Sequence, residues 1–232
     1  MRLVVFGANG PTGRQAVEQA LASGHQVSGV TRKPDEYPLR STRLDIVAAD
    51  VTDEVAVRNA VDGADAVIST YGVPYGRREI TVYSQGITHI TRAMAAHGVS
   101  RLVCVSSTTV ATEDAPSDSL LWRKVFRPLL RNSLGRTLYD DMERMERIVQ
   151  GTGLVWTVVR PGGLFDLPEP TPDYQVAPHR LPGRLTSRAD LAQTLVHEAT
   201  EPLHPRETIE VITRSGMPPF TTFLREAFGT NR

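Results

Sequence analysis

The chain has 232 residues, and its 26 lysines and arginines balance 26 aspartates and glutamates, so its formal net charge is zero. Nucleic-acid binders and proteins that bind anionic membranes normally show a basic excess, so the balance excludes a nucleic-acid binder, gives no overall attraction to an anionic membrane, and requires any anion site to be local. The length fits one large α/β domain or two small ones and is ample for a continuous core.

Cysteine usage and hydropathy indicate the compartment. Cys104 is the only cysteine, so the chain has no internal disulfide, and a reducing compartment is the simpler interpretation. The first apolar run ends at Gly7, which is too early for a signal peptide, and no stretch approaches the roughly 18 apolar residues of a membrane-spanning helix. We therefore expect a cytoplasmic protein without a membrane span.

Short runs of valine, leucine and isoleucine alternate with longer helical patterns along the first 160 residues. Parallel strands that are buried on both faces have such continuous apolar runs, so the alternation predicts βαβ units and a doubly wound, Rossmann-type α/β fold. The expected strands are 3–6, 26–30, 45–49, 64–69, 101–105 and 155–159, and the expected helices are 13–22, 54–61, 80–97 and 139–150.

Glycines stand between expected helices and the strands that follow them, at Gly24, at Gly98, and at Gly151 with Gly153. Helices commonly end with a glycine in the left-handed conformation, so we expect such a cap at all three places.

The regular alternation ends near residue 160, because residues 160–185 are rich in proline and glycine. Beyond them we expect a helix at 187–200, a strand at 208–213 and a terminal helix at 221–228. We interpret residues 1–232 as a single Rossmann-type domain, to which residues 160–232 add a small C-terminal substrate lobe.

The strongest chemical signal is a glycine-rich loop that directly follows the first strand and opens a helix. Its glycines permit a tight turn, let the backbone approach a pyrophosphate and let the helix pack on the strand, while the helix N-terminus attracts the anion. The alternative is a tight turn that needs glycine only for its geometry. The candidate dinucleotide-binding residues in this loop are Gly7, Asn9, Gly10, Pro11, Thr12 and Gly13.

The end of the second strand normally selects the dinucleotide, because NAD-binding proteins carry an acidic residue there that binds the ribose hydroxyls. This chain has Arg32 and Lys33 instead. A hydrogen bond to a charged group contributes about 1.5–3 kcal/mol, so Arg32 alone would favour NADP(H) over NAD(H) by about ten- to a hundredfold. The alternative is a solvated basic loop.

Asp50 and Val51 follow the third strand. The Asp50 side chain is placed to accept a hydrogen bond from the adenine amino group, while Val51 covers the ring. The alternative is that Asp50 belongs to the cap of the next helix, which begins near Thr52 or Asp53, since aspartate and threonine favour that position.

Together these motifs resemble those of the atypical short-chain dehydrogenase/reductases, in the NAD(P)H-binding, NmrA-like group that includes biliverdin-IXβ and flavin reductase-like proteins. The resemblance covers about residues 1–200 and also rests on residues 102–107, 153–162 and 187–192. It implies that NAD(P)H lies across the carboxyl ends of the strands. It further implies cofactor contacts from Ser69, Thr70, Tyr71 and Ser106, with Arg160, Pro161 and Gly162 near the nicotinamide.

Typical short-chain dehydrogenases use a tyrosine, a lysine four residues later and a strand-end serine. Ser107 matches the serine and Tyr139 is the candidate acid, but Glu143 stands where the lysine belongs, and its carboxylate would oppose a phenolate. Tyr139 is alternatively an ordinary aromatic on an amphipathic helix, and Ser107 alternatively caps the strand end.

Hydride transfer to an electron-poor acceptor needs less acid catalysis, and the prediction is an NADPH-dependent oxidoreductase acting on a flavin, quinone or tetrapyrrole-like molecule. Two alternatives stay open: a non-catalytic, NADP(H)-sensing, NmrA-like regulator, and a sugar-nucleotide epimerase, which would need the intact Tyr/Lys pair. We expect a monomer or homodimer.

Residues 120–136 are basic and apolar. They would form a lid over a flat, aromatic or anionic acceptor, or alternatively a surface helix or a weak membrane or partner contact. The histidines have no metal-ligand spacing, so we expect no metal site, and no GxSxG motif of a serine hydrolase is present.

Overall fold

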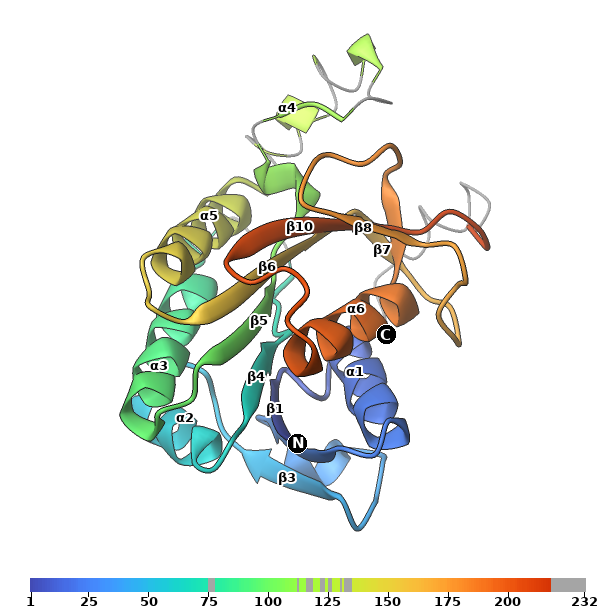
Figure 1. Ribbon diagram of the computed structural model, residues 1–232. Helices are drawn as coiled ribbons and strands as arrows, with labels where there is room; N and C mark the ends of the chain where they lie inside the picture. The colour runs from blue at the N-terminus through green and yellow to red at the C-terminus, as the bar shows by residue number, and fades with distance from the viewer. Residues whose placement is uncertain are drawn as a thin grey trace.

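The computed structural model describes residues 1–74, 78–111, 113–115, 119–121, 124, 127–129, 131 and 135–217. Its centre is an eight-stranded sheet in the order β3-β2-β1-β4-β5-β6-β10-β8 (Figure 1). Neighbouring strands are parallel, except that β8 is antiparallel to β10. The strands are β1 Arg2–Phe6, β2 Gln26–Thr31, β3 Leu44–Ala48, β4 Ala66–Ser69, β5 Arg101–Val105, β6 Val155–Pro161, β8 Gln175–Ala177 and β10 Glu207–Ile212.

Helices cover both faces of the sheet, which confirms the doubly wound fold (Figure 1). Alternate β1 residues explain why: Val4 and Phe6 are fully buried in one core, and Leu3 and Val5 are fully buried in the other. A strand buried on both faces needs a helical layer on each side. One layer contains α1 Pro11–Ala22 and α6 Arg188–Thr200, and the other contains α2 Glu54–Val61, α3 Val82–His97 and α5 Arg136–Gln150.

The chain reverses its direction of strand addition between β1 and β4, which are hydrogen-bonded neighbours. In open α/β sheets ligands bind outside the carboxyl ends of the strands at such a switch point. The glycine-rich loop begins where β1 ends, at Phe6, so the fold puts it at this position.

Two of the three expected left-handed helix caps are confirmed, with φ of +87° at Gly24 and +69° at Gly98. The prediction for the end of α5 was wrong, because Gly151 has φ of −77° and Gly153 is not left-handed. The carbonyl of Val149 there accepts from both N and Oγ1 of Thr152, at 3.1 and 2.7 Å. Threonine thus closes a turn that needs no left-handed residue.

Residues 160–217 divide between the main sheet and a smaller one. β10 and α6 belong to the main sheet and its covering layer, whereas β7 Gly163–Phe165 and β9 Leu185–Ser187 pair in a separate two-stranded sheet. β7, β8 and β9 were not predicted, because three-residue strands are too short to leave a periodic pattern. The helix expected at 221–228 lies outside the described residues.

Short elements also follow two of the main strands: the 3₁₀ turns η1 Pro34–Glu36 and η2 Thr108–Val110. Within the segment 120–136, residues 122, 123, 125, 126, 130 and 132–134 lie outside the described residues, whereas α4 Arg127–Leu129 and Arg131 are described. Within the part of the chain that the structure describes, no helix is long and apolar enough to cross a membrane.

Candidate functional site

The first and third glycines of the loop are required by backbone contacts. Gly7 has φ of +80°, and a Cβ there would lie 2.5 Å from the Tyr71 nitrogen. A Cβ on Gly13 would lie 2.2 Å from the Gly7 carbonyl oxygen, so only glycine lets α1 approach the loop this closely. These two positions fit the geometric role of glycine in a tight βα turn.

Gly10 is different, because the fold demands little of it. Its φ and ψ of −73° and 160° suit any residue, and a Cβ would meet nothing closer than the Gly7 carbonyl oxygen at 3.3 Å. A small shift would accommodate that contact. A tight turn alone therefore does not explain the second glycine, whereas close approach of a ligand to the backbone does.

The N-terminus of α1 is suited to an anion. Its N-cap residue, Gly10, has no side chain that could cap the helix, and its first turn contains no acidic residue. Pro11 lacks an N–H, but the following N–H groups of Thr12 and Gly13 lie at the positive end of the helix dipole. This uncapped end and the space left at Gly10 fit the pyrophosphate of a dinucleotide.

Two strand ends hold the loop in place. The N–H groups of Gly7 and Ala8 both donate to the Val30 carbonyl of β2, at 3.2 and 3.1 Å. On the other side, Thr70 Oγ1 donates to the Phe6 carbonyl at 2.9 Å, and Ser69 is buried at the end of β4. Ser69 and Thr70 therefore hold the start of the loop from the β4 side.

Tyr71 forms a wall beside the loop and is not arranged as an acid. Its hydroxyl donates to the Tyr83 carbonyl at 3.2 Å, and the two rings stack with centroids 6.0 Å apart. Gly86 of α3 makes room for it, since a Cβ there would lie 2.7 Å from the Tyr71 hydroxyl. Burial raises the pKa of Tyr71 far above its ordinary value, so the phenol stays protonated.

The two cations after β2 have different surroundings. The Arg32 side chain is 75% exposed, and its nearest carboxylate is Asp50, with Nη1 and Oδ2 3.9 Å apart. Lys33 Nζ lies 2.9 and 3.0 Å from the two carboxylate oxygens of Glu36. Both side chains are exposed, but Lys33 is closely paired with Glu36, whereas the Arg32 contact with Asp50 is longer, so Arg32 is the less committed cation of the two.

Asp50 does not cap the next helix, and that alternative was wrong. Asp53 caps α2 instead, accepting from the N–H groups of Val55 and Ala56, both at 3.0 Å. Asp50 Oδ1 accepts from N and Oγ1 of Thr52, at 2.9 and 2.7 Å. These bonds, with a smaller contribution from Arg32, hold the pKa of Asp50 below its usual value, so it is a fixed acceptor.

Val51 is half-buried against the core that contains α3. Its carbonyl lies 2.9 Å from Nδ1 of His89 on α3 and accepts a hydrogen bond from that nitrogen. The Asp50–Val51 turn is therefore held from both sides of Val51, by Thr52 and by His89.

Ser106 at the end of β5 belongs to a buried network that the sequence did not reveal. Its hydroxyl donates to Glu146 Oε1 at 2.5 Å, and Arg160 of β6 binds the same carboxylate through Nε at 2.9 Å and Nη2 at 2.5 Å. Glu146 is only 3% exposed. A signal was available: Glu146 is a charged residue on the apolar stripe of α5, four positions after Met142.

Pro161 and Gly162 lie where β6 leaves the main sheet. Pro161 is the last residue of β6 and pairs with Val211, and the Gly162 N–H donates to Thr186 Oγ1 at 2.9 Å. A Cβ on Gly162 would lie 2.4 Å from the Arg184 carbonyl oxygen. Glycine is therefore required here for two chain segments to pass each other.

The two candidate catalytic residues differ in accessibility. Ser107 is half-buried at the carboxyl end of β5, its Oγ accepts from the Thr109 N–H at 3.2 Å, and its hydroxyl donates to no residue that the structure describes. Tyr139 of α5 is 3% exposed and packs in the core. A phenol in that position would have to become exposed before it could contact an acceptor.

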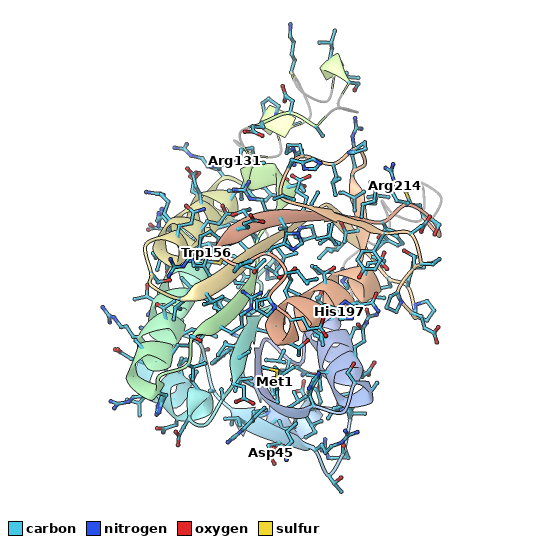
Figure 2. All side chains as sticks on the ribbon, in the orientation of Figure 1. Met1, Asp45, Arg131, Trp156, His197 and Arg214 are labelled. Atoms are coloured by element: carbon cyan, nitrogen blue, oxygen red, sulfur yellow. The ribbon has the colours of Figure 1, made fainter. Side chains whose placement is uncertain are left out.

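Glu143, which replaces the expected lysine, lies on the outer side of α5. Its Oε2 is 3.0 Å from Nη2 of Arg131, whose Nη1 is 2.6 Å from Asp140 Oδ1. Figure 2 shows Arg131 near the start of α5. The Glu143 carboxylate is thus neutralised at the surface and does not supply a group to the site.

A small polar cavity of about 180 Å³ lies next to Arg160. Its lining combines cations and carboxylates from β6, β10, the segment after β5 and the segment before β9, including Glu113, Arg160, His179, Arg180 and Glu210. Across the described ranges, this cavity included, no group of three or more histidine, cysteine, aspartate or glutamate side chains could hold a metal ion.

The chain is similar to known proteins in sequence and in fold. A family model described as NAD(P)H-binding matches residues 7–202 of the chain. An uncharacterized protein of Mycobacterium tuberculosis is 37% identical over 108 residues, which is 46% of this chain but 12% of that protein, so the match spans about an eighth of its length. An uncharacterized chloroplastic protein of Arabidopsis thaliana is 29% identical over 94% of this chain and 78% of its own length.

Solved structures share the fold. A putative NADH-flavin reductase from Streptococcus pneumoniae has a TM-score of 0.74 and 24% identity, covering 92% of this chain and 100% of that one. The anaerobillin reductase ChuY from Escherichia coli has a TM-score of 0.73 and 22% identity, covering 94% and 100%. A short-chain dehydrogenase/reductase from Veillonella parvula in complex with NADP has a TM-score of 0.75 and 15% identity, covering 92% and 95%.

Proposed function

Because the chain belongs to the NAD(P)H-binding family, we propose that it is an NADPH-dependent oxidoreductase that transfers hydride to a small conjugated acceptor. The observation that carries the proposal is the glycine loop, in which Gly10 is not demanded by the fold and α1 begins without a cap. Both features are those of a pyrophosphate site at the carboxyl edge of a parallel sheet.

Different residues of the chain would bind different parts of the cofactor. The backbone from Gly7 to Gly13 would bind the pyrophosphate, and Asp50 with Val51 would bind the adenine. Arg32 would bind the 2′-phosphate, which favours NADP(H). Ser106, Pro161 and Gly162 would line the nicotinamide end. When bound, NADPH supplies a hydride at its nicotinamide ring.

The proposed acceptor class rests on the lack of a tyrosine and lysine pair that could serve as a catalytic acid. Glu143 replaces the cation that would lower the pKa of a catalytic tyrosine, and Tyr139 is buried, so strong acid catalysis by this pair is not supported. Flavins, quinones and tetrapyrrole-like molecules are electron-poor and accept hydride with less acid assistance. The names of the fold neighbours, an anaerobillin reductase and a putative NADH-flavin reductase, agree with this class.

Ser107 is the residue best placed to assist the acceptor. Its oxygen accepts from Thr109, and its hydroxyl proton is donated to no residue in the described part of the chain. Donation to a carbonyl or ring nitrogen of the acceptor would orient it and stabilise the charge that it gains, an effect that preorganised donors supply. In this proposal Tyr139 is a core residue.

The test follows NADPH absorbance with a flavin, a quinone and biliverdin in turn. Ser107→Ala is expected to lower kcat by about tenfold or more with at least one acceptor, at unchanged NADPH affinity. Tyr139→Phe is the matched control and should retain most of the turnover. Tight binding of NADPH without its oxidation by any of the three acceptors would contradict the proposal that the protein is a reductase.

The buried Tyr139 and the replaced lysine also favour a second candidate, an NADP(H)-sensing regulator that binds the cofactor without turnover. The same assay separates the two candidates. A regulator would bind NADPH and NADP⁺ with unequal affinity and would show no reductase activity toward the three acceptors.

A further inference from the structure

Arg14 is an exposed cation on the first turn of α1, directly after the third glycine of the loop. Its side chain folds back over the loop, with Nε and Nη2 donating to Asn9 Oδ1 at 3.1 and 2.7 Å. Two hydrogen bonds to one oxygen hold a guanidinium in a defined orientation. The third nitrogen, Nη1, makes no hydrogen bond to any residue that the structure describes.

The loop that carries Asn9 lies against the end of β2. Gly7 and Ala8 both donate to the Val30 carbonyl, so Asn9 and Arg32 each follow within two residues of that shared contact. Arg14 also influences the segment after β2, since its charge acts on buried Tyr37 and partly offsets the rise in the pKa of that phenol. Arg14 and the basic end of β2 therefore belong to the same corner of the molecule.

The other cations of this corner are already occupied. Lys33 pairs with Glu36, and Arg40 Nη1 donates to the carbonyls of Tyr37 and Leu39 at 2.5 and 2.9 Å. Arg32 is the exposed exception, and a single exposed arginine is a weakly organised partner for a dianionic phosphate. Arg14, held by Asn9, is better organised.

We propose that Arg14, oriented by Asn9, binds the 2′-phosphate of NADP(H) together with Arg32. The inference rests on the proposed function only in its choice of cofactor, and it names a specificity residue that sequence reasoning missed. A phosphomonoester between two guanidinium groups would accept charge-assisted hydrogen bonds from both. The loop would thereby bind the pyrophosphate through its backbone and the 2′-phosphate through a side chain that it positions.

The test measures binding of 2′,5′-ADP and 5′-AMP by calorimetry, since these ligands differ only in the 2′-phosphate and neither can transfer hydride. Arg14→Met is expected to weaken binding of 2′,5′-ADP about tenfold or more and to change binding of 5′-AMP less than threefold. Arg14→Lys, which keeps the charge but loses the two-nitrogen contact with Asn9, should give an intermediate loss. Arg147→Met, at an exposed arginine of α5, is the matched control and should change neither ligand.

Equal weakening of both ligands by Arg14→Met would overturn the proposal, because it would assign Arg14 to the 5′-phosphate or to the loop. Unchanged binding of both ligands would overturn it as well. Neither ligand carries a nicotinamide, so the result is independent of hydride transfer. If Arg14 discriminates between the two ligands but the protein oxidises no NADPH, the proposed reductase activity is refuted and the role of Arg14 in binding the 2′-phosphate is retained.

Discussion

Asp141 of α5 accepts a hydrogen bond from the backbone N–H of Tyr83, with Oδ2 and N 2.8 Å apart, although 58 residues separate them. The same carboxylate accepts from N and Oγ of Ser84, at 3.2 and 2.5 Å. Asp141 is fully buried, and the N-cap residue of α3, Thr81, makes no side-chain cap. One helix thus caps another, and through Tyr83 the cap supports the Tyr71 wall of the cofactor loop.

The first prediction concerns this cap. Asp141→Ala should lower the free energy of unfolding by about 1–3 kcal/mol, because it removes a charged acceptor from buried N–H groups. Urea denaturation measures the loss. The control is Asp140→Ala, which removes the adjacent carboxylate that contacts Arg131 near the surface, and it should cost less than about 1 kcal/mol. Similar losses for both variants would contradict the capping role.

The second prediction separates the glycines of the loop. Gly13→Ala should destabilise the fold strongly, because its Cβ would lie 2.2 Å from the Gly7 oxygen, whereas Gly10→Ala meets its nearest atom at 3.3 Å. Thermal denaturation should show a large loss for Gly13→Ala and a small one for Gly10→Ala. Gly10→Ala should nevertheless weaken NADPH by about tenfold, and normal NADPH binding by that variant would argue against the pyrophosphate site.

The third prediction compares two neighbouring cations. Arg32→Ala should weaken NADPH by about tenfold or more and NADH by much less, because only NADPH carries the 2′-phosphate. Lys33→Ala is the matched control, since Lys33 already pairs with Glu36, and it should change both affinities less than Arg32→Ala. Fluorescence titration of the reduced cofactors measures the four constants. Equal loss of both cofactors in Arg32→Ala would remove this residue from the 2′-phosphate site.

The fourth prediction concerns Tyr37, whose side chain packs against α1. The residue is 2% exposed, and its hydroxyl makes no hydrogen bond within the described part of the chain. Replacing a buried, unpaired hydroxyl by hydrogen removes a desolvation penalty, so Tyr37→Phe should raise the free energy of unfolding by about 1 kcal/mol. A loss of stability would show that the hydroxyl has a partner in solution.

Tyr37 also predicts a pH dependence. Burial, with a smaller contribution from Glu18, raises the pKa of Tyr37 to about 12, whereas an unfolded tyrosine has a pKa of about 10. Between these values the unfolded chain has lost the proton that the folded chain retains, so stability falls as pH rises from about 10 to 12. Tyr37→Phe should weaken this alkaline loss, which denaturation at several pH values measures.

Much of the fold could be predicted because its information is local. Phe6 ends an apolar run, Gly7 follows it at once, and a helical pattern begins within a few residues, so strand, loop and helix follow from neighbouring residues. The strand β8 could not be predicted in this way, because three residues carry no period. The prediction for the end of α5 was wrong because Thr152, and not a left-handed glycine, satisfies the Val149 carbonyl in the last turn.

Some residues of the candidate site could likewise be predicted from the sequence, and others could not. Gly10 and Arg32 were identified because each follows a strand at a fixed spacing. Arg14 was missed because nothing in its sequence position indicates that its guanidinium would bind Asn9. The same is true of Glu146, which joins Ser106 to Arg160 across two strands and a helix.

The sequence by itself therefore determined the parallel sheet, its covering helices and the glycine loop, since hydrophobic period and glycine spacing are properties of adjacent residues. Only the tertiary structure decided which charged side chains remain exposed for a ligand and which are occupied by the protein. Lys33 is occupied by Glu36, and Asp141 by the first residues of α3. Such pairings depend on distances between segments, which the order of residues along one segment does not contain.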